Sequence, residues 1–177
     1  KTVFGGCVKD CSKFLPTSIK NLRDYSSLFG KVYTVIVENG SSDNTKEILR
    51  EKKTENDTFL FCDQFNKFIY RNQRLERARN LIIETIQKSE NMKNCDLFIM
   101  LDLDDMGTYR IKNEDILYSV KYLYSSEEIA AVFGNQLGGY YDMWPLRDKT
   151  YCKNDFWVEV FKYLMMNKNS FEQISKK

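Results

Sequence analysis

The sequence contains the stretch Cys95-Asp96-Leu97-Phe98-Ile99-Met100-Leu101-Asp102-Leu103-Asp104-Asp105-Met106, in which an apolar run changes abruptly into carboxylates. A short apolar run between polar residues predicts a strand buried on both faces, as in a parallel or mixed sheet. Side chains two positions apart on an extended chain point the same way, so Asp102 and Asp104 can face one divalent cation. A surface turn with solvated Asp residues is the alternative.

The composition is that of a globular protein with nearly balanced charge. The 177 residues are 42% hydrophobic and 29% charged, and 27 basic against 25 acidic residues give a net charge of +2. This balance argues against binding nucleic acid through bulk charge. No apolar run reaches the roughly 18 residues of a membrane span. We therefore expect neither a nucleic-acid partner nor a membrane span.

Cysteine and histidine usage excludes several classes of site. The chain has no His, which rules out His-containing zinc sites, Ser-His-Asp triads and Cys-His pairs. Its five Cys form no CxxC pair, and we expect reduced thiols and a cytoplasmic location. Acid–base chemistry then falls to carboxylates, Lys, Tyr or the substrate itself.

Hydrophobic periodicity predicts alternating strands and helices. Expected strands cover residues 2–8, 32–37, 58–62, 97–102 and 129–133. Expected helices cover 15–29, a short segment from 46, 75–86, a segment from Asn113 to 123 with Asn113 as cap, and 156–166. This alternation indicates an α/β fold around a largely parallel sheet, in one domain. Polar clusters follow three of the strands, at 38–44, at 102–105 and after Phe133, where an open α/β sheet binds ligands.

Four of these segments carry a family resemblance. Val37-Glu38-Asn39-Gly40-Ser41-Ser42-Asp43-Asn44-Thr45 resembles the Val-Asp-Asp-Gly-Ser-x-Asp-x-Thr turn of GT-A-fold glycosyltransferases. Arg74-Leu75-Glu76-Arg77-Ala78-Arg79-Asn80 resembles their Arg-x-x-Ala-Arg-Asn helix, and Asp102-Leu103-Asp104 their metal-binding Asp-x-Asp. Tyr140-Tyr141-Asp142-Met143-Trp144-Pro145-Leu146-Arg147-Asp148 is similar to a segment of capsule-associated mannosyltransferases and related viral glycosyltransferases. A host-cytoplasmic location would follow for a viral protein.

The resemblance implies a Rossmann-like GT-A fold in three layers, with a central, mainly parallel mixed sheet flanked by helices. Residues 1–177 would be one catalytic domain, short for the family and expected to come from a longer protein. The implied reaction transfers a sugar from a UDP- or GDP-linked donor to an acceptor hydroxyl on a glycan or glycoprotein.

The resemblance also assigns the donor side of the site. Glu38 would accept a hydrogen bond from uracil or guanine, unless it is only a turn residue, and Asn39 would shape the turn that holds the nucleotide. Asp43 is expected to cap the following helix. Arg79 would contact the diphosphate. Asp102 and Asp104 would hold Mn²⁺ or Mg²⁺, which offsets charge on the leaving diphosphate as a Lewis acid.

On the acceptor side, Asp142 is the candidate catalytic residue. It would act as general base in an inverting reaction, or orient the acceptor and stabilise the transition state in a retaining one. Further candidates for the acceptor side or for supporting contacts are Asp105, Tyr141, Trp144 and Arg147. Arg74 and Arg77 are expected to be solvated.

Two other functions compete with this interpretation. A nucleotidyltransferase also places paired carboxylates on metal at strand ends, but it usually has a glycine-rich phosphate loop, and Gly5-Gly6 alone does not make one. A nucleotide-sugar- or carbohydrate-binding module, meaning a degenerate transferase, is the alternative outside enzymes. The sequence leaves the donor, the acceptor, the stereochemistry and the oligomeric state open.

Overall fold

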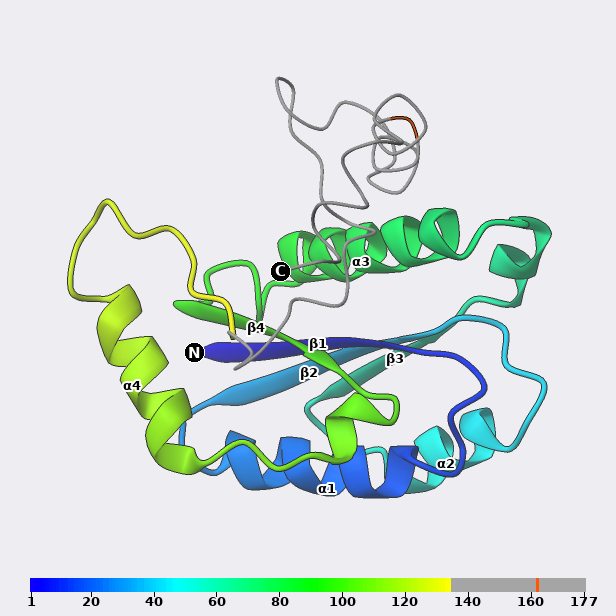
Figure 1. Cartoon of the computed structure of the whole chain (residues 1–177), viewed down its shortest axis with the longest axis horizontal. Helices are drawn as coiled ribbons and strands as arrows, with labels where there is room; N and C mark the ends of the chain where they lie inside the picture. The colour runs from blue at the N-terminus through cyan, green and yellow to red at the C-terminus, as the bar shows by residue number, and fades with distance from the viewer. Residues whose placement is uncertain (135–161, 163–177) are drawn as a thin grey trace, which may run out of the picture. The chain divides into compact units, whose positions relative to one another are not determined.

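The computed structural model describes residues 1–134 and 162, and the chain divides into two compact units, residues 1–130 and 131–177. In the first unit, four strands form one parallel sheet in the order β3-β2-β1-β4 (Figure 1). The strands are β1 (Thr2–Val8), β2 (Val32–Glu38), β3 (Asp57–Phe61) and β4 (Leu97–Asp102). The helices are α1 (Leu15–Ser26), α2 (Thr45–Lys52), α3 (Arg71–Lys88) and α4 (Asn113–Leu123), with short 3-10 turns η1 (Asp63–Lys67) and η2 (Met106–Thr108).

Helices cover both faces of this sheet. Figure 1 shows α1 and α2 on one face and α3 on the other. Successive strand residues alternate between the two layers, so Phe4 and Ile36 pack with Leu15 and Leu22 of α1, whereas Val3, Val35 and Val37 pack with Ala78, Ile82 and Ile86 of α3. The apolar runs of β1 and β2 therefore reflect burial on both faces.

Two glycines let neighbouring side chains pack tightly against the central strand. Gly5 and Gly6 lie inside β1, and a Cβ on Gly5 would overlap the ring of Phe98, while one on Gly6 would overlap Leu103. Larger residues would force these core side chains to shift. The glycine pair thus serves packing and does not form a phosphate-binding loop.

The strand order reverses at β1. From β1 the chain proceeds outward to β2 and β3, then returns to place β4 on the other side of β1. In open parallel sheets, ligands bind in the crevice outside the carboxyl ends at such a reversal. The loops after β1, β2 and β4 therefore surround the expected binding position.

The α/β class and the largely parallel sheet are confirmed, and two expectations about individual elements are wrong. Every strand pair that the structure describes is parallel, so the antiparallel component of a mixed sheet is not seen in that part. Residues 129–133 form no strand: Ile129 donates its backbone N–H to Ser126 in a turn, and Phe133 is 86% exposed. A short apolar run carries too little periodicity to identify a strand. Helix α4 begins at Asn113, but its cap is Lys112. The helix expected at 156–166 lies outside the described residues, except for Lys162.

Candidate functional site

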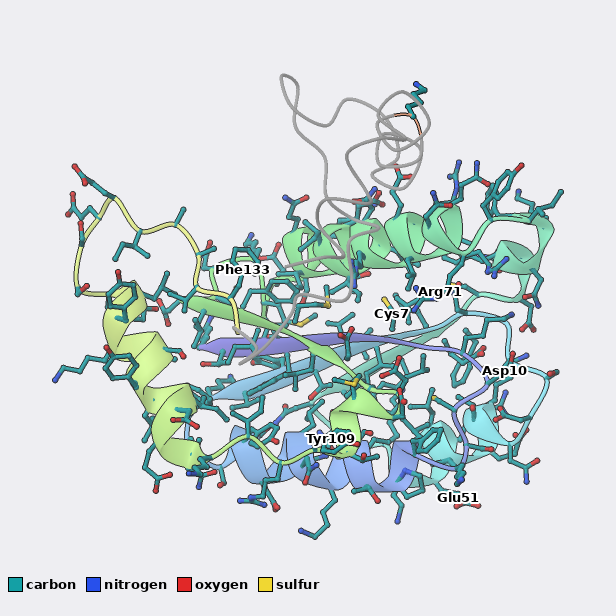
Figure 2. The ribbon with its side chains drawn as sticks, in the orientation of Figure 1. Cys7, Asp10, Glu51, Arg71, Tyr109 and Phe133 are labelled. Atoms are coloured by element: carbon teal, nitrogen blue, oxygen red, sulfur yellow. The ribbon has the colours of Figure 1, made fainter. Side chains whose placement is uncertain are left out.

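A cavity of about 190 Å³ lies at the carboxyl end of the sheet. Its walls come from the end of β1 and the loop after it, the turn after β2, the loop after β4 and the first turns of α3. The lining residues are Cys7, Val8, Lys9, Asp10, Asn39, Arg71, Arg74, Leu75 and Asp104. Figure 2 shows three of them, Cys7, Asp10 and Arg71. The cavity therefore occupies the strand-order reversal, where α/β proteins bind ligands.

The turn after β2 directs Asn39 to the cavity and Glu38 into the protein. Glu38 is fully buried, and its Oε1 accepts a 2.5 Å hydrogen bond from Ser41 N. Its Oε2 lies 4.0 Å from Lys46 Nζ and has no hydrogen-bond partner among the residues that the structure describes. Asn39 is only 3% exposed and lines the cavity, and no described group bonds to its Oδ1. Asn39 therefore lines this space and Glu38 does not, while each of the two side chains keeps one buried oxygen without a described partner.

Lys9 fixes the position of this turn. Its Nζ donates to the carbonyl oxygens of Asn39 (3.2 Å) and Gly40 (2.9 Å) and to Asn66 Oδ1 (2.5 Å). Asn66 Nδ2 donates to the same Gly40 oxygen at 2.9 Å. Gly40 has φ +75°, and a Cβ there would collide with Asn66. The loops after β1, β2 and β3 are thus tied together around Asn39.

Asp43 joins the loop after β1 to the start of α2. Its Oδ1 accepts from Thr45 N at 3.0 Å and its Oδ2 from Ser12 N at 2.9 Å. Partial burial alone would raise the pKa of Asp43, but the bonds from Thr45 and Ser12 outweigh it and lower the pKa to about 2. The expected cap is wrong by one residue, because Asn44 holds the cap position, although Asp43 still accepts from the N–H of Thr45, the first residue of α2.

The three carboxylates after β4 have different environments. Asp102 ends the strand with a side chain that is 69% exposed, and Leu103 turns into the core. Asp104 is half-buried and lines the cavity, whereas Asp105 is exposed and accepts from Met106 N at 3.0 Å. Burial raises the pKa of Asp104, and the nearby charges of Asp102 and Asp105 raise it further.

Polar side chains of α1 hold this acidic loop in place. Ser18 Oγ donates to the Asp104 carbonyl at 3.0 Å, and Asn21 Nδ2 donates to the carbonyls of Gly107 (3.0 Å) and Thr108 (3.2 Å). A Cβ on Gly107 would collide with the Asp102 carbonyl and with Ser18. Helix α1 therefore fixes the path of the backbone that carries Asp104.

The arginines of α3 are placed differently from the sequence expectation. Arg79, assigned to the diphosphate, is half-exposed, does not line the cavity, and has Nη2 3.9 Å from Asp102 Oδ1. Arg74 lines the cavity and donates to the carbonyls of Phe68 (2.5 Å) and Ile69 (3.0 Å), so its assignment to a solvated face is wrong. Arg77 lies over the Phe68 ring, 4.3 Å from its centroid.

Sequence reasoning missed Lys9, Asp10 and Arg71 as lining residues. Lys9 and Asp10 directly follow β1, so the rule that located the other clusters at strand ends would also have located them. Arg71 precedes the apolar periodicity that predicted α3, and nothing in that pattern indicates that the helix begins beside the sheet edge.

The acidic loop fits a divalent cation only with help from a ligand. Among residues 1–134 and 162, no group of three or more acidic or Cys side chains is arranged to hold a metal. Asp102 and Asp104 can supply two carboxylates, and a cation would offset the burial and the carboxylate repulsion that together raise the pKa of Asp104. Phosphate oxygens and water would have to complete the shell, as they usually do for Mg²⁺.

Cys7 contributes no thiolate to the cavity. Burial raises its pKa to about 11, with Arg79 lowering and Asp102 raising it by smaller amounts. The thiol is therefore protonated at neutral pH and is a poor nucleophile. The four described cysteines, Cys7, Cys11, Cys62 and Cys95, are free.

The acceptor-side candidates Asp142, Tyr141, Trp144 and Arg147 lie outside the described residues. In the part that the structure describes, no helix is long and apolar enough to cross a membrane. No model of a known protein family matches the chain, and no curated protein matches it.

Proposed function

We propose that the protein is a metal-dependent glycosyltransferase of the GT-A type, which transfers a sugar from a UDP- or GDP-sugar to an acceptor hydroxyl on a glycan or glycoprotein. One observation carries the proposal. Asn39 of the turn, Arg74 of the arginine-bearing helix and Asp104 of the acidic pair line a single cavity at the strand-order reversal. These residues belong to three of the segments that resemble the family.

The positions of these residues suggest a separate role for each of them in binding the donor. Asn39 would contact the donor base, because it lines the cavity at the end of β2. Glu38 would hold the turn that carries Asn39, because its Oε1 accepts a hydrogen bond from Ser41 N. Asp102 and Asp104 would hold Mn²⁺ or Mg²⁺, which acts as a Lewis acid toward the leaving diphosphate when bound. Asp142 stays the candidate for acid–base work on the acceptor.

A thermal-shift screen of nucleotide sugars with and without Mn²⁺ tests this function, because a ligand that binds the native state raises the melting temperature. We expect a UDP- or GDP-sugar to raise Tm in the presence of Mn²⁺. Asn39→Leu and Asp104→Asn should abolish the shift. Glu90→Gln is the matched control, since Glu90 is exposed and pairs only with Lys93 among the described residues.

Sugar transfer or slow hydrolysis of the donor, followed by chromatography, separates an enzyme from a binding module. Release of free sugar and nucleoside diphosphate that requires Asp104 would support a transferase. Binding without any release would favour the degenerate binding module. Absence of any nucleotide-sugar binding would refute both.

A further inference from the structure

The loop between η1 and α3 presents two adjacent apolar side chains to solvent. Ile69 is 85% exposed and Tyr70 is 65% exposed. They directly precede Arg71, the first residue of α3, which Figure 2 labels. A single exposed apolar residue is ordinary on a protein surface, so the surroundings of this apolar tip, Ile69 and Tyr70, decide what it can do.

The backbone carbonyls of the apolar tip already have donors within the protein. Arg74 Nη1 donates to the carbonyls of Phe68 (2.5 Å) and Ile69 (3.0 Å). The backbone N–H of Arg74 donates to the Tyr70 carbonyl at 3.4 Å. One arginine therefore pairs three consecutive carbonyls. This prepares the apolar tip for apolar surroundings, because a backbone carbonyl leaves water at low cost only when another donor replaces the water.

Cations lie on both sides of the apolar tip. Lys67 Nζ lies 5.3 Å from the centroid of the Phe68 ring, and Arg77 Cζ lies 4.3 Å from it. The half-buried Phe68 ring thus holds two charges next to Ile69, and Arg71 follows Tyr70 directly. The side chains of Lys67, Arg71 and Arg77 are all exposed, so their charges face solvent together with the apolar tip.

This part of the chain has a local excess of positive charge. Residues 63–79 contain five basic and two acidic residues, a net charge of +3, whereas the whole chain carries only +2. The acidic residues are Glu76 and Asp63, and Asp63 is paired with Lys46 of α2. An anionic surface would therefore be attracted to this segment, although the charge of the whole chain is nearly balanced.

We propose that the apolar tip and the cations beside it dock the protein on an anionic lipid bilayer. Ile69 and Tyr70 enter the boundary between headgroups and acyl chains, where the Tyr hydroxyl stays on the wet side. Lys67, Arg71 and Arg77 stay among the anionic headgroups. Such docking is peripheral and uses no membrane-spanning helix. It is independent of the proposed function, because it involves neither a nucleotide nor a metal.

The chemistry and size of the apolar tip favour a bilayer over other anionic partners. Proteins stack aromatic and Arg side chains on nucleic-acid bases, and an aliphatic Ile offers no such stacking. A stable protein interface covers roughly 800 Å² on each partner, which is far more than two side chains on one loop provide. A bilayer needs no complementary shape, since its acyl chains accept any apolar group.

Docking through this loop has a consequence for the cavity. Arg71 and Arg74 line the cavity as well as flanking or supporting the apolar tip. A protein docked in this way would therefore hold its cavity close to the lipid headgroups.

Flotation of the full chain with vesicles, without nucleotide or metal, tests the proposal. We expect binding to vesicles made of phosphatidylserine and phosphatidylcholine in equal parts, and much weaker binding to phosphatidylcholine alone. Binding should fall as the salt concentration rises. Ile69→Ser should weaken binding about 10-fold or more, because the burial of one Ile side chain is lost. Lys67→Gln should weaken it about fivefold through the loss of one cation.

Two variants elsewhere on the protein serve as matched controls. Tyr118→Ser removes a 69% exposed apolar side chain from α4, and Lys88→Gln removes an exposed cation from the other end of α3. Both should bind vesicles as the wild type does. Because Ile69 is exposed, Ile69→Ser should keep the urea midpoint of the wild type, which separates lost docking from lost folding.

Fluorescence gives a second measurement of insertion. Ile69→Trp should add emission that shifts to shorter wavelength on anionic vesicles and is quenched by lipids brominated on their acyl chains. Tyr118→Trp should show neither change, and the wild type, with its own Trp144 and Trp157, gives the background.

Absence of binding to anionic vesicles at low salt would overturn the proposal. Equal vesicle binding by the wild type and Ile69→Ser would overturn it too, because it would place the contact elsewhere in the chain. Binding of a single-stranded oligonucleotide that Lys67→Gln weakens and Ile69→Ser does not, in the absence of vesicle binding, would assign the cations to nucleic acid and would likewise overturn it.

Discussion

Asp104 and Asn39 are polar side chains that the folded chain buries without full compensation. Burial and two neighbouring carboxylates disfavour the ionised form of Asp104, while Asn39 Oδ1 lacks a partner in the described part of the chain. Arrangements of this kind cluster at functional sites, because the binding of a ligand or metal removes the penalty. Both side chains line the same cavity.

Asp104→Asn should raise stability in the absence of metal while removing metal-dependent binding. Because the pKa of Asp104 is raised on folding, its ionised form destabilises the native state at neutral pH. The penalty is absent below the unfolded pKa of about 4 and develops as pH rises through the folded pKa. We expect the Tm of Asp104→Asn in EDTA to exceed that of the wild type at pH 7 and to match it at pH 3. A lower Tm than wild type at pH 7 would contradict this account.

Asp43 should stabilise the native state at neutral pH, whereas ionised Asp104 should destabilise it. The folded pKa of Asp43, about 2, lies below the unfolded value of 3.8, so its contribution is full above about pH 4 and disappears as pH falls toward 2. Allowing for its partial exposure, we expect Asp43→Ala to cost about 1–2 kcal/mol at pH 7 and much less at pH 2. Urea unfolding at both pH values measures this difference. An equal loss at both would show that the carboxylate's charge is not involved.

The polar residues of the site could be located from the sequence. Which of two adjacent residues faces the cavity could not. Glu38 and Asn39 are adjacent, and the motif alone favoured Glu38 as the ligand contact. The turn that buries Glu38 and places Asn39 at the cavity has a φ of +75° at Gly40, and its carbonyls accept hydrogen bonds from Lys9. These come from loops distant in the sequence, so no local pattern contains them.

At the level of elements, α1 acts as a support for the acidic loop as well as a core helix. Ser18, Asn21 and Tyr25 occupy buried positions on the helix, and each bonds to the loop backbone between Asp104 and Ile111. The apolar periodicity predicted which face of α1 is buried. It did not indicate that polar residues on that face serve the loop.

Asn21→Leu should therefore damage both stability and the site. The substitution leaves the Gly107 and Thr108 carbonyls without their donor, at an expected cost of about 1–3 kcal/mol. It should also weaken Mn²⁺-dependent nucleotide binding by loosening the backbone of Asp104. Urea unfolding and calorimetry measure the two effects. Lys20→Ala, at an exposed position of the same helix, should show neither, and a similar result for both variants would contradict the supporting role.

The strands were predictable because their apolar, β-branched runs are bounded by turn residues. The prediction failed at 129–133, where the run is equally apolar but the chain follows a turn at Ser126 and Phe133 is exposed. What decides such a segment is a neighbouring strand to pair with, and the local sequence holds no information about that neighbour.

At the scale of the molecule, residues 1–130 contain a layered core with one hydrophobic cluster on each face of the sheet. Every cluster member that the structure describes comes from this unit. A chain truncated after Ala130 should therefore unfold in a single cooperative transition, as small domains usually do. Coincident urea transitions by circular dichroism and tyrosine fluorescence would confirm this. A gradual loss of signal would show that residues 131–177 are required for folding.

Isothermal titration of UDP- and GDP-sugars into the full chain, with Mn²⁺ and then with EDTA, tests the central claim most directly. The proposed site predicts saturable binding of one donor in Mn²⁺ that is lost in EDTA, in Asp104→Asn and in Asn39→Leu. Glu90→Gln should bind as the wild type does. Absence of binding in Mn²⁺, or binding that persists unchanged in EDTA and in both site variants, would contradict a metal-dependent nucleotide-sugar site at the carboxyl edge of this sheet.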